Sequence, residues 1–282
     1  MKNNHNNNRE DLNIGIVLPV FNVDKTISKV LSSIDEALSN LEFRFNLLII
    51  DNDSTDQTLS LIKKYYSKNP KFSENVTILV NEVNDGYGSS IKVGFKYFIS
   101  QPVSHLIIIH GDYQTSPLKL INTFISTYQK NPEIDFILAS RFMKESGIEN
   151  YSLVRKLGNY FFNYLTYFCC GHKISDNGAA MIMIKANILK DLPFSSLSNT
   201  WQFHPQFNIL LFENKLKHTE FPMKWEDSDA VSSISLVPYG IKLLKILLSY
   251  WLNKNIFKKE IDARFKPEPL PSEKKSNILI LD

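Results

Sequence analysis

LLIIDNDSTDQT, residues 47–58, joins a short apolar segment to a dense group of polar side chains and then to the start of a helical pattern. The apolar run at 45–50 predicts a buried strand. Ser54 and Gln57 form a Ser-x-x-Gln capping box, which predicts a helix from Ser54 to about Ser67. A strand that ends in polar residues and passes directly into a helix is the repeating unit of a parallel α/β sheet.

The same unit recurs along the first half of the chain. Apolar, β-branched runs predict strands near 14–20, 45–50, 76–80, 105–109 and 134–139, and helical patterns at 24–41, 54–67, 86–99 and from Pro117 onward separate them. A mostly parallel central sheet with helices on both faces accommodates this alternation, so the predicted fold class is α/β. The second half is less regular, with a loop entering a strand at 176–185, a short helix at 202–213, a strand at 218–225 and an amphipathic helix at 239–252.

Polar side chains follow each predicted strand. These groups are Pro19–Asn22, Asp51–Asp56, Asn84–Gly88, Gly111–Gln114 and Ser140–Arg141. The carboxyl ends of parallel strands share one edge of a sheet, and ligands of open α/β sheets bind there. The sequence therefore predicts a ligand site at this edge.

Composition narrows the class of protein. The chain has 282 residues, 43% of them hydrophobic, with a formal net charge of +3 and no dense cluster of Lys and Arg, so no nucleic-acid partner is expected. No run of 18 apolar residues is present, so no transmembrane helix is predicted. The adjacent Cys169 and Cys170 predict a reduced, cytoplasmic protein. Residues 1–12 are predicted to form a disordered tail, and residues 257–282 a charged, proline-containing mobile tail.

Three polar groups carry chemistry. The acids at Asp51, Asp53 and Asp56 suit a nucleobase or ribose hydroxyl, and helix capping is the alternative. Asp112 and Gln114, two residues apart, suit a hard divalent cation, and a stabilised turn is the alternative. The glycines of Asn84–Gly88 allow close approach of an anion to a helix N-terminus, although a plain turn also uses such residues.

Six segments together carry a resemblance to a known family. LPVFNVDKTI, LLIIDNDSTDQT, NDGYGSSIKVG, HGDYQTSP, ASRF and DNGAA, in this order and spacing, are similar to family 2 glycosyltransferases of the GT-A fold. The similarity runs from about residue 14 to 250 and is greatest to the branch with dolichol-phosphate mannose synthase and bacterial polyprenyl-phosphate sugar transferases. It implies a GT-A domain over 13–237, followed by an amphipathic helix at 238–256 with a possible membrane-surface contact.

The resemblance also implies roles for individual residues. Pro19, Asn22, Asp51 and Asp53 would line the base and ribose of a UDP- or GDP-sugar donor, and Asn84 and Gly86 would also bind the nucleotide. Asp112 matches the second acid of the family's Asp-x-Asp motif and Gln114 the following Gln, so both would contact Mg²⁺ or Mn²⁺. Arg141 matches the family's Ser-Arg, and Asp176 matches the Asp near the acceptor, so Asp112, Asp176 and Arg141 are the expected catalytic residues.

The sequence departs from the family pattern at four places. His110 replaces the first motif acid, which leaves the metal shell one carboxylate short or gives that position to the sugar. Gly178-Ala179-Ala180 replaces the usual Ser-Gly-Phe, and the stretch 203–206 (Phe-His-Pro-Gln) stands where relatives often carry acids. The stretch 225–233 has no Arg, although Ser232 and Ser233 remain near the expected acceptor phosphate.

A polyprenyl phosphate is the acceptor that these features favour. A phosphate is already ionised and needs no general base, and His204 removes one candidate acid. Arg155 would pair with the phosphate, and the aromatic segment 158–170 and the helix 239–252 would rest on a membrane surface, with burial in the core as the alternative. The enzyme is then expected at the cytoplasmic face of a membrane, and a membrane-spanning partner that recruits it stays open.

Two other functions remain at this point. A cytoplasmic transferase in cell-surface polysaccharide synthesis would add sugar to a saccharide, with Asp176 or His204 as base. A degenerate member of the family would bind nucleotide without turnover, and His110 and the missing Arg motivate that alternative.

Overall fold

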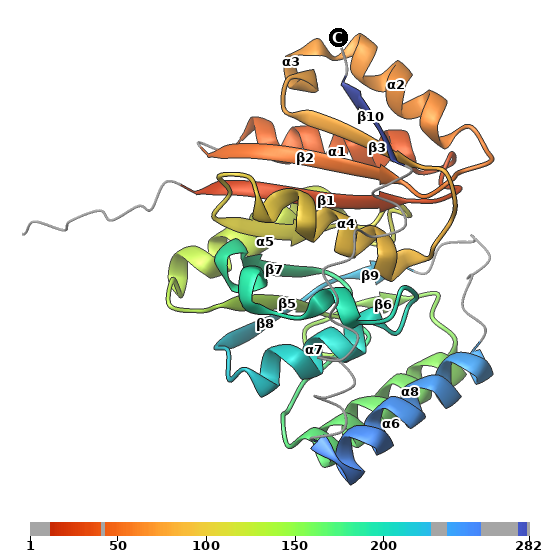
Figure 1. Ribbon diagram of the computed structural model, residues 1–282, viewed down its shortest axis with the longest axis vertical. Coiled ribbons are helices and arrows are strands. Elements are labelled where there is room, and N and C mark those ends of the chain that lie inside the picture. Colours follow the sequence, from red (N-terminus) through yellow and green to blue (C-terminus); the bar gives the residue numbers. More distant parts are fainter. Residues whose placement is uncertain (1–11, 41–42, 227–235, 255–275, 281–282) are drawn as a thin grey trace, which may run out of the picture.

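An eight-stranded sheet with the order β10-β3-β2-β1-β4-β7-β5-β8 forms the centre of the computed structural model, which describes residues 12–40, 43–226, 236–254 and 276–280 (Figure 1). Its strands are β1 (Asn13–Val20), β2 (Arg44–Asp51), β3 (Val76–Asn81), β4 (His105–Ile108), β5 (Phe136–Ser140), β7 (Ile182–Lys185), β8 (His218–Pro222) and β10 (Ser276–Ile280). Only β7 and β10 pair antiparallel with their neighbours in this sheet. The α/β prediction and its mostly parallel sheet are confirmed.

Helices cover both faces of the sheet because alternate strand residues are apolar on both sides. In β1, Ile16 and Leu18 pack in a core with α1 (Ile27–Ser39), α2 (Thr58–Lys68) and α5 (Pro117–Lys130). Val17 lies between them and faces the opposite core, which contains α4 (Tyr87–Ile99) and α7 (Phe203–Glu213). Pro117 occupies the first turn of α5, as predicted, and Ser116 caps that helix.

The remaining elements are short or lie at the edges. They are α3 (Pro70–Ser73), α6 (Leu153–Cys170), α8 (Leu236–Leu252), the 3₁₀ turns Ala186–Asp191 and Phe194–Ser196, and a two-stranded parallel sheet of β6 (Ile148–Glu149) and β9 (Trp225–Glu226). β7 enters the main sheet between β4 and β5, an insertion that the simple alternation of strands and helices does not predict. Among the described residues, no helix is long and apolar enough to cross a membrane.

The capping box predicted at Ser54 is wrong. Helix α2 begins at Thr58, four residues later, and its N-terminal residue Gln57 makes no side-chain capping bond. The Ser54 hydroxyl instead accepts from the backbone N–H of Asn22, and Asp56 accepts from Thr58 N at 2.8 Å. Ser54 thus binds the loop after β1, and the Asp56 carboxylate, not the Ser54 hydroxyl, accepts the backbone N–H at the start of α2.

The end of the chain also differs from the prediction. The tail expected over 257–282 contains strand β10, which pairs with β3 from Ser276 opposite Asn81 to Ile280 opposite Thr77. Within the predicted N-terminal tail, Leu12 is buried in the core, and residues 1–11 lie outside the described part. Figure 1 shows β10 and the α6–α8 pair at opposite ends of the longest axis of the molecule.

Candidate active site

The loops after β1 and β2 hold each other in place at the carboxyl edge of the sheet. Asn22 Oδ1 accepts from Thr55 N at 2.8 Å and from Asp56 N at 3.4 Å. Asn22 and Asp53 both have left-handed backbone conformations, with φ of 51° and 63°. This conformation is uncommon outside glycine, and Asn and Asp tolerate it best. The Asn22 side chain therefore fixes the loop after β2 through backbone hydrogen bonds, whereas the Asp53 side chain is exposed to solvent.

Asp51 lies beneath this pair of loops with only 1% of its surface exposed. Its Oδ1 accepts from Ser54 N at 3.2 Å. Burial raises the pKa of the Asp51 carboxyl, the Ser54 bonds lower it, and the nearby Asp56 and Asp53 raise it further. Pro19 is buried beside it in β1 and lies opposite Ile50. The predicted nucleoside residues Pro19, Asn22, Asp51 and Asp53 thus gather at one place.

A ladder of asparagine amides extends the site towards β3. Asn81 Nδ2 donates to Asn52 Oδ1 at 3.0 Å, and Asn52 Nδ2 donates to Asn84 Oδ1 at 2.7 Å. Asn84 Oδ1 also accepts from the backbone N–H of Gly86. Asn52 and Asn81 were not singled out from the sequence. The available signal was position: Asn52 directly follows β2, between Asp51 and Asp53, and Asn81 is the last residue of β3.

The glycines after Asn84 serve the protein's own backbone. Gly86 has φ 96°, and a Cβ there would lie 2.5 Å from the carbonyl oxygen of Asn199. A Cβ on Gly88 would lie 2.4 Å from the oxygen of Ser198. Asn199 O also accepts from Ser89 N. The 198–199 backbone therefore approaches these glycines closely and occupies one N–H of the first turn of α4, and binding of an anion at this helix start stays a prediction.

Tyr87 joins two histidines at the centre of the site. Its hydroxyl lies 2.9 Å from Nε2 of His110 and 2.9 Å from Nε2 of His204, and its ring stacks on Trp201 at 4.6 Å between centroids. Burial lowers the pKa of His110 and holds that of His204 well below its usual range. Two of the departures from the family pattern, 94 residues apart in sequence, thus meet at one hydroxyl.

Asp112 and Gln114 follow β4 in a half-buried loop, and Gln114 N makes a long contact of 3.4 Å with Asp112 Oδ1. Thr26 donates to Gly111 O at 2.7 Å and ties this loop to the one after β1. Over the described part of the chain, no cluster of three or more His, Cys, Asp or Glu residues could hold a metal ion. One carboxylate and one amide fit the way Mg²⁺ is often held, with substrate phosphates and water as the other ligands.

Arg141 and Asp176 form a buried ion pair on the other side of the site. Arg141 Nε donates to Asp176 Oδ2 at 2.7 Å, its Nη2 donates to Oδ1 at 2.9 Å, and its backbone N donates to Oδ2 at 3.1 Å. The pairing outweighs burial, so the pKa of Arg141 lies above its usual range. Asp176 is wholly buried. Three donors on one carboxylate leave it poorly placed to act as a base.

Aromatic rings and a glycine surround this ion pair. The Arg141 guanidinium carbon lies 5.0 Å from the ring centre of Trp225, 5.4 Å from Phe142 and 6.0 Å from Tyr151. A Cβ on Gly178 would approach Arg141 Nη2 to 3.0 Å, which explains a glycine at this position. Asn163 of α6 holds the 175–177 loop by bonding Ser175 O and Asn177 N.

The residues expected at the acceptor are only partly assembled. Arg155 lies half-buried in the first turn of α6, and its carbonyl accepts from Asn159, which also donates to Tyr151. His204 lies with Tyr87 rather than with Arg141. Ser232 and Ser233 lie outside the described residues.

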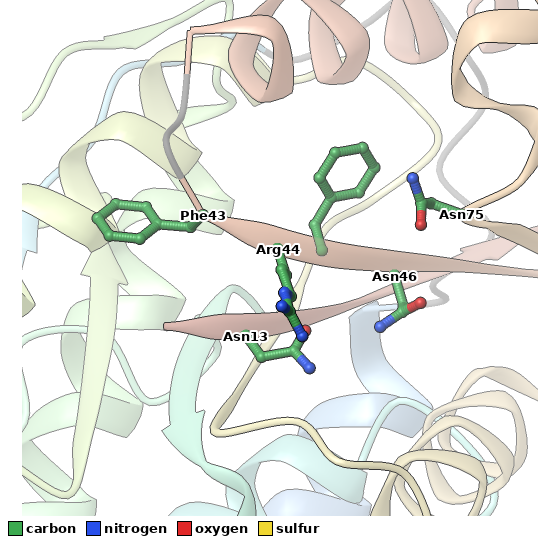
Figure 2. A pocket seen from close by; sticks show the side chains of 6 residues that line it. Asn13, Phe43, Arg44, Asn46 and Asn75 are labelled. Carbon is green, nitrogen blue, oxygen red and sulfur yellow. The ribbon is translucent and has the colours of Figure 1, made fainter. Parts of the chain in front are cut away.

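A separate cavity of about 260 Å³ opens at the opposite edge of the sheet. Figure 2 shows Asn13, Phe43, Arg44, Asn46 and Asn75 around it, at the amino ends of β1 to β3. None of the predicted site residues lines it, so the candidate site is the set of carboxyl-edge loops.

Comparison with known proteins agrees with this geometry. Residues 15–193 match the family model described as Glycosyl transferase family 2. The chain is 25% identical over 253 residues to the human dolichyl-phosphate beta-glucosyltransferase, covering 84% of this chain and 75% of that protein. It is 24% identical over 184 residues to the dodecaprenyl-phosphate galacturonate synthase of Rhizobium johnstonii, covering 65% of this chain and about half (51%) of that relative.

Solved structures share the fold at low identity. Glucosyl-3-phosphoglycerate synthase from Mycobacterium tuberculosis, in complex with Mn²⁺ and UDP-glucose, matches with a TM-score of 0.58 and 12% identity over 85% of this chain and 79% of that one. Mannosyl-3-phosphoglycerate synthase from Rubrobacter xylanophilus matches with a TM-score of 0.56 and 14% identity over 92% and 78% of the two chains.

The fold and the family match together define an enzyme of the GT-A class. The chain belongs to glycosyltransferase family 2 and is a glycosyltransferase. Its relatives include transferases that act on polyprenyl phosphates, as the sequence resemblance implied.

Proposed function

We propose that this enzyme transfers a sugar from a UDP- or GDP-sugar to a polyprenyl phosphate, with the help of a divalent metal ion. The observation that carries the proposal is the position of Arg155 at the start of α6, one of a pair of helices that expose a broad apolar face. A phosphate on a lipid tail requires this combination of a cationic side chain and apolar surface.

The donor half of the proposal rests on the loops after β1 to β4. The exposed Asp53 and the buried Asp51 offer acceptors for a base or ribose hydroxyl. Asp112 and Gln114, one loop further along the sheet, would hold Mg²⁺ or Mn²⁺ with the diphosphate. When bound, the ion would neutralise the charge that develops on the leaving nucleoside diphosphate.

The acceptor half rests on what Asp176 and His204 do in the structure. These two residues are the candidate bases for a hydroxyl acceptor. The Asp176 carboxylate accepts three bonds from Arg141, and His204 Nε2 is bonded to Tyr87. An ionised phosphate acceptor needs no proton removed, so the engagement of both side chains supports it over a saccharide hydroxyl.

The exposed face of α6 and α8 supports a lipid tail. The large apolar side chains that these two helices expose are Leu153, Val154, Leu157, Tyr160, Phe161, Tyr164, Tyr167, Phe168, Val237, Ile241, Leu244, Leu248, Trp251 and Leu252. Phe168 of α6 and Trp251 of α8 contact each other. Soluble surfaces rarely expose so many large apolar side chains together, and Tyr and Trp suit the membrane interface. Lys242 and Lys245 are exposed on the same helix, where anionic head groups would meet them.

An acceptor assay tests this function. Purified enzyme with Mn²⁺ and a panel of UDP- and GDP-sugars is offered polyprenyl phosphate in detergent micelles or a soluble oligosaccharide, and products are identified by mass spectrometry. We expect a lipid-phosphate glycoside. Product on the oligosaccharide alone would favour the polysaccharide transferase, and nucleotide binding without any product would favour the degenerate member of the family.

The Asp112→Asn variant tests the proposed role of Asp112 as a ligand of the metal ion. We expect about a 100-fold loss of turnover, the size of effect seen when a charge-stabilising group is removed. The melting temperature should change by only a few degrees, because a loop acid contributes little to the core. Glu36→Gln, which changes an exposed acid on α1, is the control and should keep full turnover. Full turnover by Asp112→Asn would refute the metal role.

A further inference from the structure

Lys92 of α4 is a lysine with only 2% of its surface exposed. Its Nζ donates to the carbonyl oxygens of Leu197 at 2.8 Å and Ser195 at 3.3 Å, and to the side-chain oxygen of Asn199. No carboxylate among the described residues forms an ion pair with it. Burial, with a smaller contribution from the charge of Lys96, lowers the pKa of Lys92 to about 8. A buried ammonium without a counter-charge costs stability, which indicates a task other than stabilising the fold.

The three donors of Lys92 match three acceptors on one short segment. A lysine ammonium has three N–H groups and no acceptor. Its partners all lie within residues 195–199, which we call the pre-α7 segment because it leads from the 3₁₀ turn Phe194–Ser196 towards α7. All three donors are thus engaged by the protein itself. Lys92 is therefore placed to fix this segment to α4 and not to bind a phosphate.

The pre-α7 segment lies between two helices of the site. Asn199 O accepts from Ser89 N in the first turn of α4 at 3.0 Å, and Ser198 N donates to Gln206 Oε1 of α7 at 2.8 Å. With the bonds from Lys92, α4 therefore holds the segment through both its backbone and a side chain.

A stacked aromatic pair depends on this segment. Trp201, two residues after Asn199, is partly exposed and stacks on Tyr87, with ring centroids 4.6 Å apart and planes 11° from parallel. The Tyr87 hydroxyl lies 2.9 Å from Nε2 of His110, two residues before Asp112. The pair, which we call the aromatic wall, therefore lies beside the loop expected to hold the diphosphate.

We propose that Lys92 is a positioning residue of the donor site, because it fixes the pre-α7 segment and thereby holds the aromatic wall where it orients the sugar of the donor. This inference rests on the proposed function for placing a nucleotide-sugar beside Asp112. The nucleoside is expected elsewhere, in the loop with Asp53, which Asn22 holds. Loss of Lys92 should therefore impair turnover more than nucleotide binding.

Hydrogen exchange tests the fixing of the segment without any substrate. Lys92→Met replaces the ammonium with an unbranched apolar side chain. The Ser89 amide, whose acceptor is Asn199 O, should exchange at least about tenfold faster in this variant, because exchange reports local opening. Lys63→Met changes an exposed lysine on α2, which covers the other face of the sheet, and should leave this rate unchanged. An unchanged Ser89 rate in folded Lys92→Met would overturn the inference.

Kinetics separate positioning from a purely structural role. Turnover by folded Lys92→Met should fall by about 10- to 100-fold, the size of effect that misplaced groups around a reacting centre produce. Its affinity for UDP or GDP, measured by titration calorimetry, should stay within about threefold of the wild type, because sites without shared contacts act independently. A lower urea midpoint with wild-type turnover by the folded enzyme would overturn the positioning role, and so would a loss confined to nucleotide affinity.

Asn199→Ala gives a second arm in case Lys92→Met does not fold. It keeps the lysine and removes one of its three acceptors, so Ser89 exchange should rise and turnover should fall, each by a smaller factor. No change in either would overturn the inference. A wild type that binds nucleotide but turns over no donor would overturn the proposed function and the role of the aromatic wall, whereas the exchange rates would still decide whether Lys92 fixes the segment.

Discussion

Asp51 and Asp176 are both almost completely buried at the carboxyl edge of the sheet, yet their surroundings differ. The Asp176 carboxylate accepts two hydrogen bonds from the Arg141 guanidinium and one from the Arg141 backbone N–H, so the negative charge of Asp176 is balanced within the protein. Asp51 accepts from the backbone of Ser54, has no cation paired with it among the described residues, and lies near Asp53 and Asp56. A buried charge that the protein has neutralised serves the fold, whereas one with spare acceptor capacity is suited to a ligand.

The strongest test of this contrast is Arg141→Ala. Removing one partner of a buried ion pair leaves the other charge unpaired, and typical costs are about 3–5 kcal/mol. Urea denaturation should show a loss of this size. The double variant Arg141→Met with Asp176→Leu should regain much of the stability but no activity. A single variant as stable as wild type would mean that Asp176 is not balanced by Arg141.

Asp51→Asn addresses the other member of the comparison. It should weaken UDP or GDP binding by about 1–3 kcal/mol, because a buried hydrogen-bond acceptor for the nucleoside loses its charge. Stability should fall little, since Asn keeps an oxygen for Ser54. Titration calorimetry that gives unchanged affinity would show that Asp51 serves its loop alone.

A third buried carboxylate sharpens the comparison. Asp35 of α1 accepts from the Tyr65 hydroxyl at 2.8 Å, and burial raises the pKa of its carboxyl from 3.8 to about 6. Because the folded pKa lies above the unfolded one, the unfolded chain releases its proton first, and stability falls as the pH rises from about 4 to 6. Asp35→Asn should remove this fall and be about 3 kcal/mol more stable than wild type at pH 8, with little difference at pH 4. Urea denaturation at both pH values measures this, and a variant weaker at both would mean that the Tyr65 bond outweighs the burial.

The smallest expected effect concerns the acceptor end. Lys242→Glu with Lys245→Glu should weaken binding to anionic liposomes, by about 1 kcal/mol for each lysine removed from the surface. Co-sedimentation measures this, and added salt should reduce the difference. Lys64→Glu with Lys68→Glu makes the same charge change on α2, away from α8, and should have no effect. If the α8 double variant binds anionic liposomes as well as the α2 double variant does, then the α8 lysines have no electrostatic role at the membrane.

The sequence predicted the elements better than it predicted their contacts. Hydrophobic period and strand-end polarity located β1 to β5, because these patterns are local. The role of Ser54 was wrong because its partner, Asn22, is 32 residues away. The contact between the glycine loop and the 198–199 backbone could not be predicted because the two segments are more than 100 residues apart in sequence. The Tyr87 bridge and the three bonds on Asp176 depend in the same way on packing between distant segments.

β10 has a consequence for the behaviour of the enzyme in solution. Without it, β3 would be the last strand of the sheet, with a row of unpaired amides and carbonyls facing outward. Such an edge is a template for pairing with another chain and promotes aggregation. The five residues from Ser276 to Ile280 cover it. β10 thus replaces β3 as the edge strand of the sheet, and its five residues, one fewer than in β3, present a shorter unpaired edge at the end of the molecule opposite the α6–α8 pair.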